Sequence, residues 1–283
     1  MYQYSMTQWI VGNEDIERSM ARLRKFGYDG IELAAEAEML DSSRLKALMQ
    51  KYGLVCTSLC GIFTENRDLT APAGEKAEEA VAYICRNVDF AVEVGAPYII
   101  VVPSPVGRTE IPKGCTYQQM WENSIKNIRI AADYAAEHHV KLAIEAINRY
   151  ETYFVNTINK AHRLVKEIDH PAVYIMADLF HMSLEERDIN AALHRIADKL
   201  IHVHIADNTR EAAGLGNTDF KSILNTLKQI GYCGPLTMEF MPRVSNPYSA
   251  GEMDTMSQMM DYYAQQAIQY MRMMEKSITP ESM

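Results

Sequence analysis

Strand-like and helix-like segments alternate along the whole chain of 283 residues. Short apolar or β-branched runs predict strands at residues 4–6, 31–33, 54–59, 98–102, 141–144, 173–177, 200–205 and 236–240. Longer amphipathic stretches predict helices at residues 14–26, 42–52, 75–94, 118–138, 157–168, 189–196, 219–230 and 256–273. Each helix would connect two parallel strands through a right-handed crossover. Eight such units are what a closed (β/α)8 TIM barrel requires, so we expect one α/β barrel domain over residues 1–283.

An open, doubly wound sheet is the alternative arrangement of the same units. It is disfavoured because no GxGxxG turn follows the first strand. A second reason lies at the ends of four successive strands, each of which carries a residue able to bind a divalent cation: Glu145, Asp178, His204 and Glu239. These side chains converge on one point only if the sheet closes into a ring.

The four residues predict a metal site. Three carboxylates at one point would repel and raise each other's pKa, so we expect a divalent cation between them. Three oxygen donors and one imidazole suit Mn²⁺, Co²⁺ or Mg²⁺ better than a metal that prefers thiolates. His202 and His204 lie on the same face of their strand, so either could be the ligand. We expect His204, because it is nearer the carboxyl end of the strand.

Charge and cysteine content exclude several partners and compartments. The net charge is −9 and the 28 Lys and Arg residues are scattered, so we expect no nucleic acid partner. The five cysteines are odd in number and show no CxxC spacing, which argues against a disulfide framework and favours a reducing cytoplasm. The N-terminus is not signal-like, and no apolar run approaches the ~20 residues that cross a bilayer, so we expect no membrane association.

Several motifs in the C-terminal half occur together in one known family. They are residues 145–151, 178–186, 202–204, 208–210, 214–216 and 238–239. As a set they resemble the ketose 3-epimerases, the D-tagatose and D-psicose (allulose) 3-epimerases of the xylose-isomerase-like barrels. The resemblance runs over residues 141–242, and the ligand separations of 33, 26 and 35 residues are similar to those of the family. Residues 101–107 depart from the family's small-residue segment, which shapes the distal end of the sugar.

The resemblance implies a metal-dependent epimerase that inverts C3 of a ketose through an enediolate, without a nucleotide cofactor. It implies that Glu145 and Glu239 each bind the metal and act as base or acid on opposite faces of C3. Asp178 and His204 would be ligands only. The implied cofactor is one divalent metal ion, Mn²⁺ foremost, with Co²⁺ or Mg²⁺ as alternatives.

Further residues are implied to contact the sugar. Three of them would hydrogen-bond its O1 to O3 region: Glu151, His181 and Arg210. Arg210 would also stabilise the charge of the enediolate. Four aromatic residues near strand ends could exclude water from the intermediate or belong to the core: Trp9, Phe63, Phe180 and Phe240. A homodimer or homotetramer is expected, because residues 256–273 carry apolar side chains around much of the helix and the resemblance points the same way.

Other activities in the same barrel superfamily are compatible with these motifs. An aldose–ketose isomerase would use the same metal and a similar enediolate, and a lyase acting on 3-keto sugars is a third enzyme class. DNA-repair endonucleases with this barrel bind three zinc ions through extra histidines on earlier strands. Residues 54–61 and 98–103 contain no histidine and the chain is acidic, which disfavours that activity. A sugar-binding barrel that has lost activity would lack part of the ligand set, which is intact here.

Overall fold

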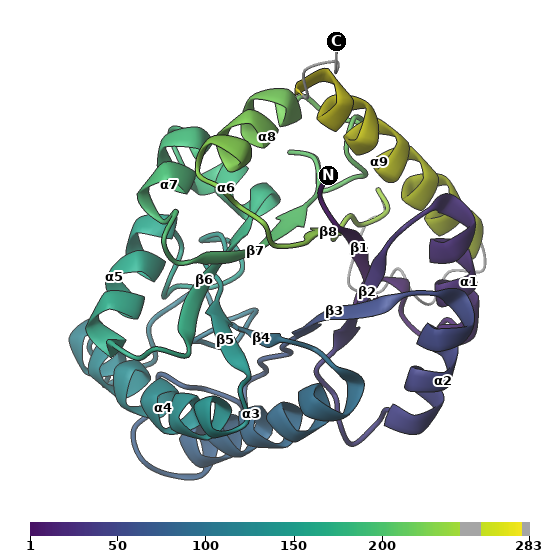
Figure 1. The fold of residues 1–283 in the computed structure, drawn as a ribbon. Helices are drawn as coiled ribbons and strands as arrows, with labels where there is room; N and C mark the ends of the chain where they lie inside the picture. Colours follow the sequence, from purple (N-terminus) through teal and green to yellow (C-terminus); the bar gives the residue numbers. More distant parts are fainter. Residues whose placement is uncertain (244–255, 279–283) are drawn as a thin grey trace.

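A closed barrel of eight parallel strands forms the centre of the computed structural model, which describes residues 1–243 and 256–278 (Figure 1). Each strand is hydrogen-bonded to the next in sequence, and β8 closes the ring against β1. The strands are β1 (Tyr4–Thr7), β2 (Gly30–Ala34), β3 (Val55–Cys60), β4 (Tyr98–Val101), β5 (Lys141–Ile144), β6 (Val173–Asp178), β7 (Leu200–Ile205) and β8 (Leu236–Met238). The predicted (β/α)8 fold is confirmed.

Helices surround the barrel (Figure 1). They are η1 (Trp9–Val11), α1 (Ile16–Phe26), α2 (Ser42–Tyr52), α3 (Glu75–Val94), α4 (Tyr117–Glu137), α5 (Ile158–Ile168), α6 (Leu179–Glu185), α7 (Ile189–Arg195), α8 (Phe220–Gln229) and α9 (Met256–Ile278). Local signals set their ends. At α2, the Asp41 side chain accepts the backbone N–H groups of Ser43 and Arg44, and Gly53 ends the helix with φ of 63°.

The structure adds two short helices, η1 and α6, to the eight predicted ones. Helix α6 follows β6 without a loop, because Asp178 is both the last residue of the strand and the N-cap of the helix. Its side chain accepts a hydrogen bond from the backbone N–H of His181 at 2.8 Å. The sequence did not predict this helix, because it begins at the last residue of a strand and no turn residues separate the two elements.

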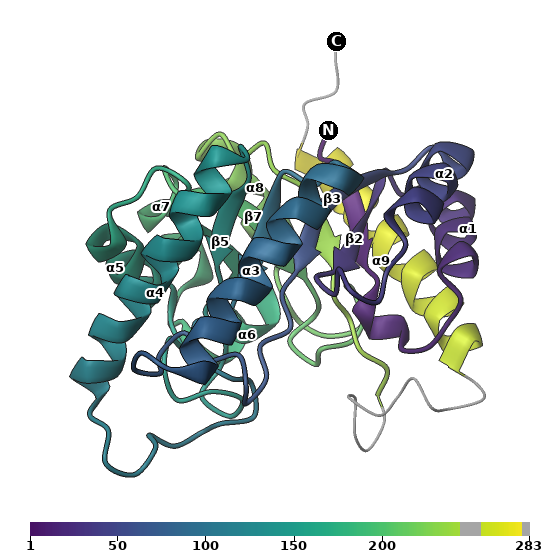
Figure 2. The ribbon, with the colours of Figure 1, turned by 90° about the horizontal axis from the view of Figure 1, so that it is seen from below.

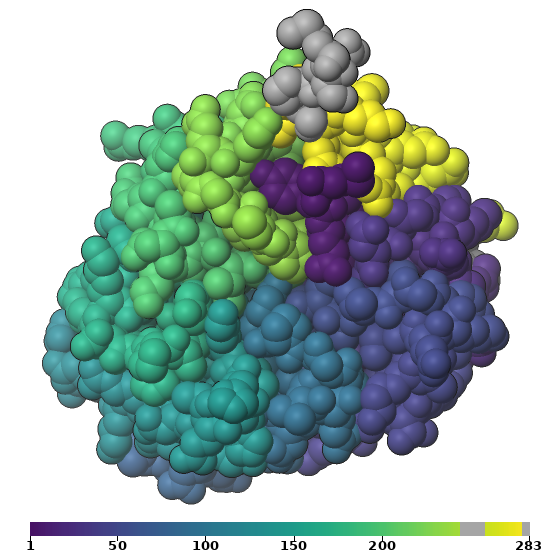
Figure 3. Space-filling view, in the orientation of Figure 1, coloured from purple at the N-terminus to yellow at the C-terminus, as the bar shows by residue number. Residues whose placement is uncertain are grey.

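The two ends of the barrel differ. The loops that follow the strands gather at one end with α6, and the N-terminus lies at the other (Figure 2). Figure 3 shows the N-terminal end, where the first residues (purple) lie across the surface beside α9 (yellow). An apolar cluster separate from the main core includes Tyr98, Ile100, Ala143 and Met176 of β4, β5 and β6. In the ranges that the structure describes, no helix has the length and apolar character needed to span a membrane.

Candidate active site

The four ligand-type residues predicted from the sequence meet at the carboxyl end of the barrel. Glu145 directly follows β5, Asp178 ends β6, His204 lies in β7 and Glu239 directly follows β8. One potential ligand atom from each lies within 4.8 Å of those of the other three. None of the four residues is more than 5% exposed. The structure therefore brings all four into one buried cluster, which we call the ligand group.

His204 turns its Nδ1 atom toward this group. The atom lies 3.2 Å from Glu239 Oε2 and 3.6 Å from Asp178 Oδ2. Despite these short distances, it has no hydrogen bond of acceptable geometry within the described part of the chain. A buried polar atom without a hydrogen bond is costly, so this nitrogen fits a ligand to a cation better than a partner of its neighbours.

The charges of the group act strongly on one another. Burial raises the pKa of Glu145 well above its usual range, and the negative charge of Glu239 raises it further. Burial also acts to raise the pKa of Asp178, but the electrostatic influence of the neighbouring imidazoles of His181 and His204 outweighs it and holds the pKa below its usual value. Carboxylates this close are stabilised by a cation, and three carboxylates with one imidazole fit a single Mn²⁺, Co²⁺ or Mg²⁺ ion.

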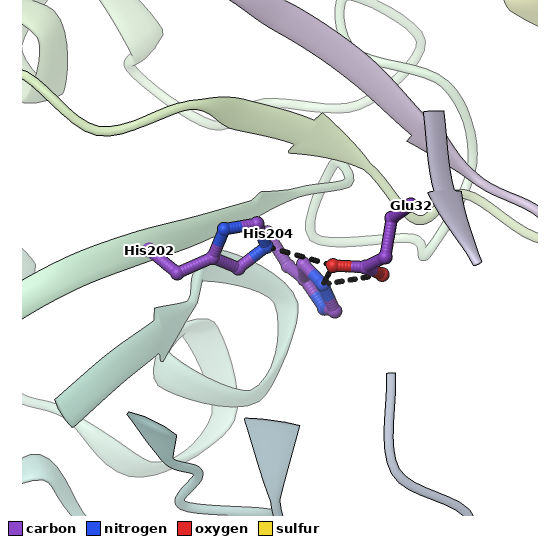
Figure 4. Close-up of side chains that lie close together, drawn as sticks. All are labelled: Glu32, His202 and His204. Atoms are coloured by element: carbon purple, nitrogen blue, oxygen red, sulfur yellow. Dashed lines mark hydrogen bonds and ion pairs between the residues drawn. The ribbon is translucent and has the colours of Figure 1, made fainter. Parts of the chain in front are cut away.

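Glu32 of β2 contacts the Nε2 atom of His204, on the side of the ring opposite the Nδ1 atom (Figure 4). His204 Nε2 lies 3.0 and 3.2 Å from the two Glu32 oxygens, and His202 Nε2 lies 3.0 Å from Oε2. The Ser58 hydroxyl donates to the same Oε2 at 2.6 Å. A proton on Nε2 is therefore bound by Glu32, which leaves Nδ1 for the ligand group. The sequence analysis did not identify Glu32 as a site residue.

The two histidines of β7 have different surroundings. The register between β6 and β7 places His204 beside Asp178 and His202 beside Met176. His202 Nδ1 is hydrogen-bonded to the Tyr98 hydroxyl at 2.8 Å, inside the barrel. Within the described residues, His204 is the histidine that joins the three carboxylates.

The three residues predicted to bind substrate line one cavity together with Glu145. Arg210 Nη1 donates to Glu151 Oε1 at 2.8 Å, and the guanidinium group lies 4.7 Å from the centre of the Phe180 ring. His181 Nε2 lies 4.0 Å from Glu145 Oε1. The structure therefore places Glu151, His181 and Arg210 beside the ligand group, on loops and on α6 that follow its strands.

Asn148 connects two of these residues and has no role in the sequence analysis. Its Nδ2 atom donates to Glu151 Oε1 at 2.8 Å and contacts His181 Nδ1 at 2.7 Å. Its Oδ1 accepts the backbone N–H of Tyr150 at 2.9 Å, which fixes the orientation of the amide. Because an amide nitrogen can only donate, His181 Nδ1 accepts and the ring proton lies on Nε2, toward Glu145.

The loop that carries Arg210 is organised by a buried carboxylate. Asp207 accepts hydrogen bonds at 2.8–3.0 Å from backbone N–H groups of Asn208, Gly214, Gly216 and Thr218. Arg210 itself has φ of 64°, in the left-handed region that non-glycine residues seldom adopt. This conformation is typical of functional positions that the surrounding structure determines. Asp207 was not predicted, because its role depends on the folded loop.

A cavity of about 330 Å³ lies next to the ligand group and is lined by two of its members, Glu145 and Glu239. Trp9 and Phe63 line it, as expected of an apolar wall, whereas Phe180 and Phe240 are not part of its lining. Trp9 also donates its indole N–H to Glu239 Oε1 at 2.9 Å. The lining is completed by further residues on the same end of the barrel: Cys60, Gly61, Ile62, Thr64, Glu65, Val102, Val106, Glu145, Ile147, Glu151, His181, Arg210 and Glu239.

Known proteins are similar to this chain in sequence and in fold. A family described as "Xylose isomerase-like TIM barrel" matches residues 20–271. The 3-dehydro-D-guloside 4-epimerase of Escherichia coli (strain K12) is 30% identical, over 84% of this chain and 91% of that protein. The L-ribulose 3-epimerase of Methylomonas sp. (strain DH-1) is 28% identical, over 81% and 80%. The crystal structure of D-allulose 3-epimerase from Methylomonas sp. in complex with D-allulose covers 96% of both chains, with a TM-score of 0.84 and 26% identity. The chain belongs to the xylose isomerase-like TIM barrel family.

Proposed function

We propose that the protein is a metal-dependent epimerase that inverts a carbon next to the carbonyl of a keto sugar, C3 in the case of a ketose. One observation carries the proposal: Glu145 and Glu239 directly follow two different strands, β5 and β8, line the same cavity and belong to the same ligand group. The names of relatives support it, since they include an L-ribulose 3-epimerase and a complex of an allulose 3-epimerase with D-allulose. The E. coli relative is named for a glycoside, which extends the substrate class beyond free ketoses.

Inversion requires that a proton leaves the carbon on one face and another arrives on the opposite face. When bound to the four ligands, the metal ion would supply a Lewis acid for the oxygens next to that carbon. One of Glu145 and Glu239 takes the proton as a carboxylate, and the electron pair of the C–H bond moves into an enediolate. The other, protonated, returns a proton to the opposite face. No electrons are gained or lost overall, so no nucleotide cofactor is needed.

Three residues position the substrate. His181 donates from Nε2, because its Nδ1 accepts from Asn148. Arg210 brings a positive charge to the same side of the cavity and stabilises the enediolate, while Glu151 accepts from sugar hydroxyls. The hydrogen bond between Arg210 and Glu151 holds both side chains in place before the sugar arrives.

We assign the metal to Glu145, Asp178, His204 and Glu239, and Mn²⁺ is the first ion to test, followed by Co²⁺ and Mg²⁺. The orphaned Nδ1 atom of His204 supports this assignment.

We further propose a cytoplasmic homodimer or homotetramer. The five cysteines are all unpaired, as in proteins of a reducing compartment. On α9, most apolar side chains pack against the rest of the protein, but Tyr262 and Met273 remain more than half exposed and would be available to a second copy.

The test is turnover of a panel of ketoses in deuterium oxide with added Mn²⁺. The proposal requires deuterium at the inverted carbon, seen by NMR. Glu145→Gln and Glu239→Gln should each reduce turnover by roughly 10² to 10⁴, the usual contribution of a general acid or base. Glu275→Gln is the matched control, because Glu275 is also buried but bonds to Tyr4 at the N-terminal side of the barrel.

The same experiment distinguishes the other activities of the superfamily. An aldose product would identify an isomerase, and a dehydrated or cleaved product a lyase. Near-normal epimerisation by Glu239→Gln would refute the two-base assignment.

A further inference from the structure

A second cavity, of about 440 Å³, lies beside the candidate active site. Glu65 lines both cavities. The connection between β4 and α4 lies at the end of the barrel where α6 is found (Figure 2), and two of its residues face different cavities. Val106 lines the first cavity and Arg108 lines the second. The two cavities are therefore neighbours on either side of one short segment.

This segment is fastened to the candidate active site. The backbone N–H of Val106 donates to the Phe63 carbonyl at 3.1 Å, and that of Gly107 donates to the Glu151 carbonyl at 2.8 Å. Both acceptors belong to residues that line the first cavity. The segment overlaps residues 101–107, the stretch that departs from the ketose 3-epimerase pattern and that the resemblance implies lies near the distal end of the sugar. A ligand that extends past the distal end of the first cavity would meet the second.

The polar wall of the second cavity is built from paired charges. Arg108 donates to Glu65 at 2.6 Å and also to Asp68, and Lys76 donates to Glu65 at 2.6 Å. Asp68 is only 2% exposed and accepts the Thr70 hydroxyl at 2.6 Å. Because these cations already have carboxylate partners, the wall is suited to a neutral ligand with many hydroxyl groups rather than to a phosphate.

Apolar residues contribute to the lining as well. Pro72, Ile111, Pro112 and Met120 line the same cavity, together with the charged residues Glu110 and Lys113. A sugar ring presents C–H groups on its faces and hydroxyl groups at its edge, so a pocket lined by both apolar and hydrogen-bonding residues matches it.

We propose that the second cavity is a subsite for a hydroxyl-rich ring that is joined by a glycosidic bond to the keto sugar reacting in the first cavity. This inference rests on the proposed function and names its substrate class, a glycosylated keto sugar. Two kinds of compound share this chemistry. One is a 3-oxo glycoside, whose carbonyl lies in the reacting ring, and the other is a ketose that carries a glycosyl group on a distal hydroxyl.

The experiment compares solvent deuterium incorporation, with Mn²⁺ present, into three substrates: a free ketose, a 6-O-glucosyl ketose and a glucosyl 3-oxo-glucoside. At least one glycosylated substrate should have a kcat/KM about tenfold to a hundredfold above that of the free ketose, the gain expected from one or two net hydrogen bonds. The glycosylated substrate with the higher kcat/KM shows which of the two kinds of compound the subsite accepts.

A variant tests whether the second cavity causes the preference. Cys115 lines this cavity and is exposed, so Cys115→Trp fills it without disturbing the core. The variant should remove the increase in kcat/KM for the glycosylated substrate and leave kcat/KM for the free ketose unchanged. Cys233→Trp is the matched control, since Cys233 is also exposed but lies between α8 and β8, at the N-terminal end of the barrel.

Each outcome decides one of the two proposals. Equal kcat/KM for free and glycosylated sugars would overturn the subsite while leaving the epimerase intact. A preference that survives in Cys115→Trp would also overturn it. If none of the three substrates exchanges deuterium in the unmodified protein, the proposed function itself fails.

Discussion

Replacing Glu32 by Gln tests how the metal site is held, at a residue that lies outside the ligand set. The two Glu32 oxygens lie 3.0 and 3.2 Å from His204 Nε2, and the residue is completely buried. Gln has nearly the same shape but no charge. The substitution therefore keeps the packing between β2 and β7 and weakens the charge-assisted hydrogen bond that orients the His204 ring.

The expected loss is in metal affinity. Partners that orient a ligand histidine typically contribute about 10- to 100-fold to affinity. That range corresponds to about 1.4 to 2.8 kcal/mol, which agrees with the ~1.5 to 3 kcal/mol of a hydrogen bond to a charged group. We expect the dissociation constant for Mn²⁺ to rise by this factor in Glu32→Gln. Glu32→Asp retains the charge and should recover part of the affinity.

Isothermal titration of the metal-depleted protein with Mn²⁺ measures this loss without any assumption about the substrate. Glu275→Gln is again the control, because it removes a buried carboxylate far from the ligand group and should leave the Mn²⁺ affinity unchanged. Thermal unfolding of the metal-free variants separates general destabilisation from a loss confined to metal binding. If Glu32→Gln bound Mn²⁺ as tightly as the unmodified protein, the positioning role of Glu32 would be refuted.

Three other substitutions have definite expected outcomes. Asp178→Asn should weaken Mn²⁺ binding more than Glu32→Gln does, because the substitution changes a proposed ligand. If calorimetry gave an unchanged dissociation constant for Mn²⁺, Asp178 would not be a metal ligand. Asp207→Ala should lower kcat/KM by about tenfold or more, because the loop that carries Arg210 loses its central hydrogen-bond acceptor, while the circular dichroism spectrum stays the same. An unchanged kcat/KM would show that Asp207 is not needed to position Arg210. Gly61→Ala should destabilise the protein by about 1 to 3 kcal/mol in thermal unfolding, since an added Cβ would lie 2.3 Å from the Ile100 carbonyl oxygen. An unchanged midpoint would contradict this close packing.

The barrel could be predicted because its elements carry local signals. Helix α3 has the predicted ends, Glu75 and Val94, since Gly95 takes φ of 77° and stops the helix before the apolar run of β4. Helix α6 could not be predicted, because the side chain of Asp178 starts it inside what the sequence shows as the end of a strand. Local patterns thus identify the repeating units, whereas α6 at the mouth of the barrel depends on a single capping contact.

The ligand set could be predicted for a related reason. In a parallel barrel, the ends of consecutive strands meet, so the position of Glu145 or Glu239 along its own strand already determines where it lies. Asn148 and Asp207 act through contacts within folded loops, which residue spacing does not show. Their signal was only that they lie within three residues of a ligand or a substrate-binding residue.

Glu32 shows where inference from the sequence ends. It stands in the middle of β2, and β3 has an extra residue, Thr57, between the partners of Ile31 and Glu32, an irregularity of pairing that the sequence pattern does not show. Its partner His204 is 172 positions away along the chain. Both imidazoles of β7 are completely buried, and the Nε2 atom of each lies 3.0 Å from an oxygen of the single Glu32 carboxylate. The packing of the barrel interior and the orientation of the metal ligand therefore depend on the same residue, so a change at His202 that moves Glu32 should also alter metal affinity.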